Sequence, residues 1–166
     1  ADALATVAQA FDEHPEAQWL IGRCDIIDAD GNAFRHAITR YKNRILRAHS
    51  HQRQLRQNCI SQPAVFWREQ FGRQIGPLDE SLHYTMDYDL WLRMGQRSRP
   101  LIVDRLLAHF RLHAQSKSGA RNRRQFDEGY EVACRYIGDD RASRLIHRFN
   151  VEKIVLAYRL MGLVGL

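Results

Sequence analysis

A β-strand that ends in a tight turn is predicted by the stretch Trp19-Leu20-Ile21-Gly22-Arg23-Cys24-Asp25-Ile26-Ile27-Asp28-Ala29-Asp30-Gly31. Its first part is rich in Trp, Ile and Leu, which favour extended backbone, and the Asp and Gly residues that follow are typical of a turn. A second short run, over residues 33–39, continues the pattern of a β-hairpin. We therefore expect a hairpin in which Asp28 and Asp30 shape the turn rather than hold a metal.

Helices and strands are expected on both sides of this hairpin. In chain order, the other predicted elements are a helix over 4–11, a basic, Gln-rich connector over 41–57, a strand over 63–67, a helix over 68–75, a helix over 85–96, and strands over 101–103 and 106–112. Residues 119–166 are helical by composition, and we expect three helices there, broken near residues 138–140 and at Asn150. The sequence thus predicts an α/β fold with a helical C-terminal tail.

The two faces of the strand predicted over 106–112 differ in character. Alternate residues share an apolar face, namely Leu106, Ala108, Phe110 and Leu112. The opposite face holds Leu107, His109, Arg111 and His113. On a strand the imidazoles of His109 and His113 stand about 13 Å apart, so they cannot share one metal ion and at most one of them is a ligand.

Composition narrows the class of protein. The 166 residues are 45% hydrophobic and 27% charged, as in one globular domain. Their apolar runs are far shorter than the roughly 18 residues that a membrane-spanning helix needs. A formal net charge of +6 favours anionic partners. The three cysteines form no CxxC pair, so we expect reduced, buried thiols in a cytoplasmic protein.

Two acidic residues, Asp87 and Asp89, lie at the start of the helix predicted over 85–96. Acidic side chains at that end offset the helix dipole, and this role alone is enough to explain them. A catalytic base would need one carboxylate that faces the reacting group. Because residues two apart on a helix diverge by about 200°, at most one of the pair serves as that base.

Five motifs occur in a fixed order along the chain. They are Gly22-x-x-Asp25-x-x-Asp28-x-Asp30-Gly31, then Gln62-Pro63-Ala64-Val65-Phe66-x-Arg68, then Ile75-Gly76-x-Leu78-Asp79-Glu80-Ser81-Leu82, then Met86-Asp87-Tyr88-Asp89-Leu90-Trp91-Leu92-Arg93, and finally Ala108-x-Phe110-Arg111-x-His113-x-x-Ser116-Lys117-Ser118. Together they resemble the C-terminal half of a bacterial family 2 glycosyltransferase with the GT-A fold. The resemblance implies an acceptor-side half over residues 1–118, with part of a GT-A-like mixed sheet and flanking helices. Residues 119–166 match no motif of that family and form the helical extension.

The resemblance also implies roles for single residues in an inverting transfer of a sugar from a nucleotide-sugar donor to an acceptor hydroxyl. Asp87 takes the place of the general base, with Met86 where many relatives have Glu. The residues expected to bind substrate are Gln62, Asp89, Trp91 and Arg111. Asp89 would either orient the helix or bind an acceptor hydroxyl. His113 would help to hold Mg²⁺ or Mn²⁺ on the donor's diphosphate.

Further expectations follow from the part of such enzymes that this chain lacks. Their nucleotide-binding half precedes the first helix of this sequence, so the chain is expected to be cut from a longer protein and to be inactive alone. The implied acceptor is a glycan or a lipid-linked molecule. We expect a cytoplasmic location, at the inner face of the membrane with peripheral association, and homo-oligomers that form through an exposed sheet edge.

Two other classes of function fit parts of the sequence. The stretch between Gly31 and Arg68 is basic and free of acidic residues, which suits a nucleic-acid-binding module. Aromatic residues are not interleaved with it as base stacking requires, so we expect no nucleic-acid partner. The second alternative is a structural or partner-binding domain that uses residues 151–166 at a membrane surface. That tail is apolar on all sides, which favours packing in a core.

Overall fold

The structure of the chain is a computed structural model that describes residues 2–113 and 123–163. Its strands are β1 (Trp19–Ile27), β2 (Val65–Trp67) and β3 (Leu101–Arg111). Its helices are α1 (Ala3–Glu13), α2 (His36–Arg47), α3 (His51–Arg56), α4 (Glu69–Ile75), α5 (Met86–Arg97), α6 (Arg123–Ile137) and α7 (Arg141–Leu163), with a 3₁₀ turn η1 (Gln62–Ala64). The α/β class expected from the sequence is confirmed. None of the helices in the described residues is both long and apolar enough to cross a membrane.

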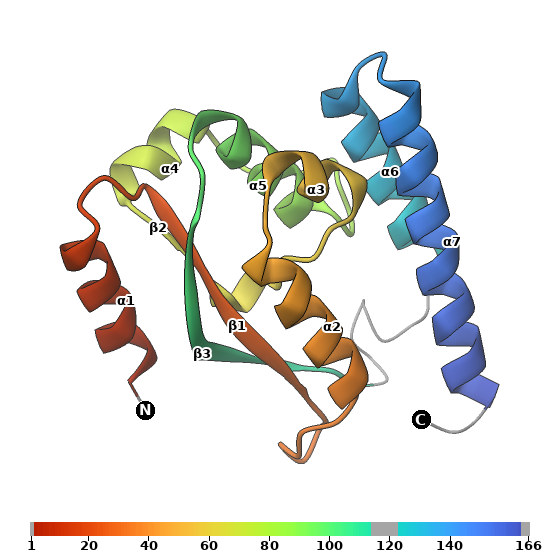
Figure 1. Cartoon of the computed structure of the whole chain (residues 1–166), viewed down its shortest axis with the longest axis horizontal. Helices are drawn as coiled ribbons and strands as arrows, with labels where there is room; N and C mark the ends of the chain where they lie inside the picture. The colour runs from red at the N-terminus through yellow and green to blue at the C-terminus, as the bar shows by residue number, and fades with distance from the viewer. Residues whose placement is uncertain (1, 114–122, 164–166) are drawn as a thin grey trace.

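The three strands of the described residues form one mixed sheet in the order β2-β1-β3 (Figure 1). β1 is antiparallel to β2, with Trp19 opposite Trp67, and parallel to β3, with Ile27 opposite Arg111. β1 and β3 approach closely at Gly22, where the Cβ of any other residue would collide with the Leu107 side chain. The central strand of the sheet, β1, is therefore the strand that the sequence predicts. Gly22 leaves room for the Leu107 side chain and so permits the parallel pairing with β3.

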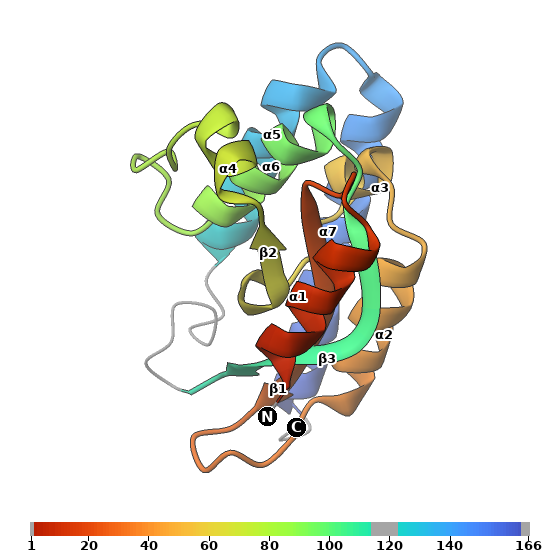
Figure 2. The same cartoon turned by 90° about the vertical axis from the view of Figure 1, so that its left-hand side faces the viewer.

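Helices cover both faces of this sheet (Figures 1 and 2). On one face, Val7 of α1 packs in a cluster with Leu20 and Leu107. On the other face, Trp19 and Ile21 belong to a cluster that also contains Leu46 of α2 and Leu90, Trp91 and Met94 of α5. The alternation of side chains along β1 thus separates two cores, and α5 with its acidic first turn belongs to the core on the α2 face.

The C-terminal helices pack against α5 and α3. Leu82, Tyr88 and Leu92 share a third cluster with Val132 and Ala133 of α6. The predicted break near residue 138 is confirmed by Gly138, which has a φ of 61° between α6 and α7. The expected boundary at residues 118 and 119, and the motif residues 116–118, lie outside the described part of the chain.

The predicted break at Asn150 is wrong, because α7 continues through it. Asn150 Nδ2 donates a hydrogen bond to the Arg56 carbonyl at 3.2 Å. One turn earlier, His147 Nδ1 lies 2.8 Å from the Leu55 carbonyl oxygen, to which it donates. Side chains that could compete with the helix backbone are bonded to α3 instead, so the helix is not interrupted.

The predicted β-hairpin and the predicted connector are also wrong. Asp28 shapes the turn as expected, since its carboxylate accepts hydrogen bonds from the backbone N–H groups of Asp30 and Asn32. After the single bridge between Ile27 and Ala33, however, the chain turns into α2 rather than a second strand. α2 forms because Thr39 and Leu46 are buried on its inner face, while its arginines project outward.

The alternation predicted for residues 106–112 is only partly right. Leu106 is 39% exposed and Leu107 is 7% exposed, the reverse of the expectation. The register with β1 shifts at this point, because Gly22 pairs with Val103 and the next residue pairs with Leu106. This irregularity also joins the two predicted strands into one, and the expected order of faces returns from Ala108 to Leu112.

Candidate functional site

Asp87 lies in the first turn of α5, where it is half-buried. Its Oδ1 accepts a hydrogen bond of 2.7 Å from the backbone N–H of Tyr88. Within the described residues, Oδ2 accepts no hydrogen bond. The carboxylate is therefore held at one oxygen, while the other accepts no hydrogen bond within the described part of the chain.

Two opposing effects act on the acidity of Asp87. Burial of the carboxyl group raises its pKa above the ordinary value. The hydrogen bond from Tyr88 and the positive charge of Lys42 lower it by less. The net effect is a raised pKa, so Asp87 holds a proton more strongly than an exposed aspartate does.

Lys42, on α2, is the cation that acts on Asp87. Its Nζ donates a hydrogen bond of 2.9 Å to Ser61 Oγ, and burial lowers its pKa. Lys42 was not expected at the site, because residues 41–57 are predicted to form a connector. A signal was present, since Lys42 lies three residues from both Thr39 and Ile45, on the inner side of a helix.

Gln62 follows Ser61 at the start of η1, and its side chain is exposed. No hydrogen bond to the Gln62 side chain occurs within residues 2–113 and 123–163. Gln62 is the next residue after Ser61, which accepts the hydrogen bond from Lys42, the cation that acts on Asp87. Gln62 is thus an exposed residue next to the one that Lys42 contacts.

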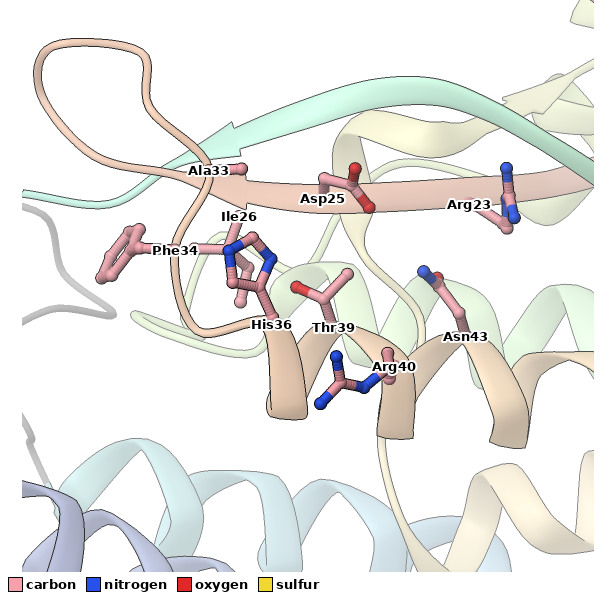
Figure 3. A pocket seen from close by; sticks show the side chains of 9 residues that line it. All are labelled: Arg23, Asp25, Ile26, Ala33, Phe34, His36, Thr39, Arg40 and Asn43. Carbon is pink, nitrogen blue, oxygen red and sulfur yellow. The ribbon is translucent and has the colours of Figure 1, made fainter. Parts of the chain in front are cut away.

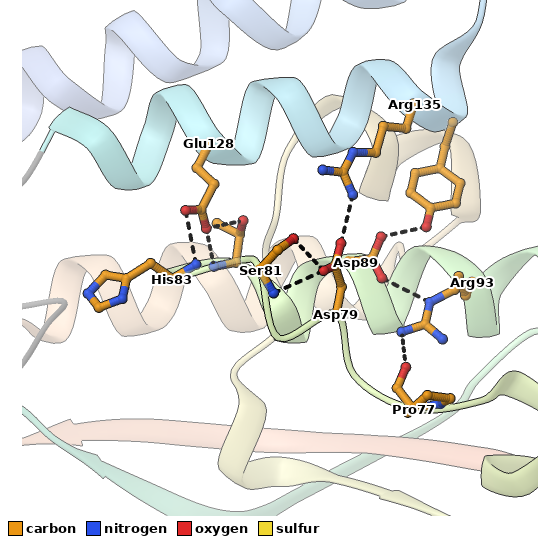
Figure 4. A network of polar contacts seen from close by, with 10 residues as sticks. Pro77, Asp79, Ser81, His83, Asp89, Arg93, Glu128 and Arg135 are labelled. Carbon is orange, nitrogen blue, oxygen red and sulfur yellow. Dashed lines mark hydrogen bonds and ion pairs between the residues drawn. The ribbon is translucent and has the colours of Figure 1, made fainter.

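Asp89, labelled in Figure 4, has different surroundings from Asp87, as the angle between them on a helix requires. It is 4% exposed, and its Oδ2 accepts a hydrogen bond of 2.9 Å from Arg93 Nε. Its Oδ1 accepts another of 2.5 Å from the hydroxyl of Tyr136 on α6. Arg93 continues the network to the carbonyls of Ile75 and Pro77 at 2.9 Å each. Two roles are expected for Asp89, to orient the helix or to bind an acceptor hydroxyl. These contacts fit the first role, because they hold α5 against α6 and the carbonyls of Ile75 and Pro77.

The expectation that Trp91 binds substrate needs correction. Its side chain is 1% exposed and stacks on Trp19, with ring centroids 6.2 Å apart and planes 13° apart. Trp67 meets it edge to face at 5.8 Å. Trp91 is enclosed by the core on the α2 face, because the apolar side of α5 must be buried against the sheet, and a substrate does not reach it.

Arg111 and His113 lie at the far end of β3. Arg111 Nη1 donates to the carbonyls of Asp28 and Ala29, at 2.9 and 2.5 Å, and so fastens the end of β3 to the turn after β1. His113 follows the strand and is exposed. The described residues contain no group of three or more His, Cys, Asp or Glu side chains that could hold a metal ion. His113 therefore does not complete a divalent-cation site with them.

A pocket lies between β1 and the start of α2 (Figure 3). Arg23 and Asp25 line it from β1, and His36, Thr39 and Asn43 line it from α2. The Thr39 hydroxyl is buried there with no hydrogen-bond partner in the described residues. Neither Asp87 nor Gln62 lines this pocket, so it is separate from the candidate base.

Comparison with known proteins does not assign the chain to a family. No protein-family model matches it, and no curated protein or solved structure matches it.

Proposed function

We propose that this chain is the acceptor-side part of an inverting glycosyltransferase in which Asp87 is the general base. The observation that carries the proposal is the contrast between two carboxylates on one helix. Asp89 is buried and bonded at both oxygens, to Arg93 and Tyr136. Asp87 is bonded at one oxygen, and its other oxygen accepts no hydrogen bond within the described residues. A base needs an oxygen that is not already committed to the protein, and this difference supports Asp87 rather than Asp89 in that role.

In the proposed reaction, the acceptor hydroxyl attacks the anomeric carbon of the donor sugar. The new C–O bond forms while the bond to the nucleoside diphosphate breaks, and the diphosphate leaves with that electron pair. The hydroxyl proton passes to Asp87. A raised pKa suits this step, because it makes the carboxylate a stronger proton acceptor. A positioned base of this kind contributes about 10²–10⁴-fold to the rate.

Other residues have narrower parts in the proposal. Gln62 is exposed and would contact the substrate. Arg111 would add positive charge toward an anionic donor, although one of its nitrogens is bonded to the turn after β1. Mg²⁺ or Mn²⁺ would neutralise the diphosphate, with His113 as one ligand. The described residues do not complete such a site.

The proposal includes a nucleotide-sugar donor, a glycan or lipid-linked acceptor, and a cytoplasmic location with peripheral contact to the membrane. The outer face of α7 supports the membrane contact. Leu145 is 68% exposed and Phe149 is 65% exposed on that face. Arg148 and Lys153 lie on the same helix, and the Lys153 ammonium lies 5.4 Å from the centroid of the Phe149 ring. Exposed apolar side chains beside basic ones suit an anionic lipid surface.

The test is the substitution Asp87→Asn in the intact protein, with Asp30→Asn as the matched control. Asn keeps the shape of the side chain but cannot accept the proton, so sugar transfer should fall by at least about 100-fold. Donor binding, measured by calorimetry, should be unchanged. Asp30 is exposed in the turn after β1, and its variant should retain full activity. Transfer by Asp87→Asn within about threefold of the wild type would reject Asp87 as the base.

A further inference from the structure

We propose that Glu128, on α6, is a positioning residue for Asp87. Its carboxylate binds the entry segment of α5, defined as residues 83–85, and so sets where the first turn of α5 and the Asp87 side chain lie. The inference rests on the proposed role of Asp87 as a base. Because Glu128 lies in the helical extension, residues 119–166, this segment would help to build the site although it matches no motif.

The contacts of Glu128 involve each residue of the entry segment, and Figure 4 shows Glu128 beside His83. Glu128 Oε1 accepts hydrogen bonds from the backbone N–H of Tyr84 at 2.7 Å, the N–H of Thr85 at 2.8 Å and the hydroxyl of Thr85 at 2.7 Å. Its Oε2 accepts from the N–H of His83 at 3.1 Å. One carboxylate thus orders three consecutive residues, and charged acceptors make the stronger class of hydrogen bond.

The entry segment leads directly to the base. Thr85 is the N-cap residue of α5, and its carbonyl accepts the first helical hydrogen bond, from Asp89 N–H at 3.0 Å. An N-cap threonine usually accepts a hydrogen bond from the first turn, but the Thr85 hydroxyl donates to Glu128 instead. Asp87 is two residues further on and is bonded to the N–H of Tyr88. Displacement of Thr85 would therefore tilt the turn that carries Asp87.

α6 also holds α5 beyond the entry segment. Arg135 donates to Asp79 at 3.0 Å, and Tyr136 donates to Asp89 at 2.5 Å (Figure 4). Val132 and Ala133 pack against Leu82, Tyr88 and Leu92. These contacts lie on both sides of Asp87 along the chain. Glu128 is thus one end of an interface that keeps the base-bearing turn in place, and its occupied oxygens leave it no part in the proton transfer itself.

The variants that test this are Glu128→Ala and Glu128→Gln, with Glu131→Gln as the control, all in the intact protein. Glu131 is exposed on the same helix. Alanine removes every hydrogen bond to the entry segment. Glutamine removes the charge and keeps an acceptor in place of Oε1, so it retains the contacts with Tyr84 and Thr85, but its NH₂ group cannot accept from the N–H of His83. Circular dichroism and thermal unfolding would show that each variant folds.

The readouts are kcat and KM for sugar transfer and the pKa of Asp87 from carboxyl NMR. With Glu128→Ala, kcat should fall by about 10- to 100-fold while KM for the acceptor changes little, since a small misplacement of a catalytic group has a cost of this size. The pKa of Asp87 should fall toward its ordinary value, because a loosened turn exposes it to water. Glu128→Gln should restore most of both quantities, and Glu131→Gln should match the wild type.

The failure of this inference is distinct from the failure of the proposed function. If Asp87→Asn abolishes transfer while a folded Glu128→Ala variant keeps the wild-type kcat and Asp87 pKa, Glu128 does not position the base. If Asp87→Asn leaves transfer intact, the base assignment is wrong whatever Glu128 does. Should Glu128→Ala fail to fold, Thr85→Val removes one hydroxyl contact alone, and it should lower kcat and the Asp87 pKa in the same direction. Wild-type values for that variant would overturn the proposal.

Discussion

The ammonium of Lys42 acts on the carboxylate of Asp87, although one side chain comes from α2 and the other from the first turn of α5. Lys42 is itself bonded to Ser61, next to Gln62. A residue from a basic stretch with no motif therefore helps to set the acidity of the candidate base.

Replacement of Lys42 by methionine should raise the pKa of Asp87 further. The positive charge favours the ionised carboxylate, so its loss favours the protonated form. Because the base is active when ionised, the acidic limb of the pH profile for sugar transfer should move to higher pH. Arg44→Met, at an exposed position of the same helix, is the control and should leave the profile in place. A shift to lower pH would contradict the assigned sign.

The substitution Asp87→Asn should stabilise the protein at neutral pH. The folded state raises the pKa of Asp87, so folding disfavours the ionised carboxylate, and stability is lost as pH rises through this group's titration. Asparagine removes that loss and still accepts the Tyr88 hydrogen bond. The melting temperature of the variant should exceed that of the wild type at pH 7, and the two should converge below the ordinary pKa of aspartate. Equal melting temperatures at pH 7 would show that burial of the carboxylate has no cost.

Asp89→Ala should destabilise the fold far more than Glu69→Ala. Both acids pair with an arginine four residues later, but the Asp89 side chain is 5% exposed and the Glu69 side chain is 79% exposed. Loss of Asp89 leaves Arg93 without its carboxylate partner, which costs about 3–5 kcal/mol, whereas an exposed helical pair contributes about 0.3–0.5 kcal/mol. Urea unfolding of both variants measures the difference. Similar midpoints for the two would argue against the Asp89 network.

Stability should fall as pH drops from 6.5 to about 4, in part because of His49. Burial and the nearby charges of His51 and Arg53 lower the pKa of His49 to about 4. Below the ordinary histidine pKa of 6.5, His49 binds a proton in the unfolded chain but not in the folded chain. This difference favours unfolding by up to about 1.4 kcal/mol per pH unit. His49→Gln should flatten the pH dependence of the unfolding free energy in this window. His36→Gln, at an exposed position, should leave it steep.

Local sequence was enough to predict β1 and α5, because their own residues favour a strand and a helix. β1 was predicted from its apolar, strand-favouring residues, and α5 from the helical spacing of Leu90, Trp91 and Met94. The helix predicted over 68–75 ends as expected, and Gly76 follows it with a φ of 88°. The divergence of Asp87 and Asp89 also follows from helix geometry alone.

Other features were decided by tertiary structure, since they depend on contacts between segments far apart in the chain. α2 is basic enough to resemble a connector, and it becomes a helix because Thr39 and Leu46 are buried on its inner face. Trp91 was assigned to substrate, but its ring is enclosed between Trp19 and Trp67. Spacing predicts which residues share a face of an element, whereas the neighbour that covers the face is set by how elements pack. The sequence therefore did not predict the partners of the two carboxylates. The packing of α2 and α6 around α5 brings Lys42 to Asp87 and Tyr136 to Asp89.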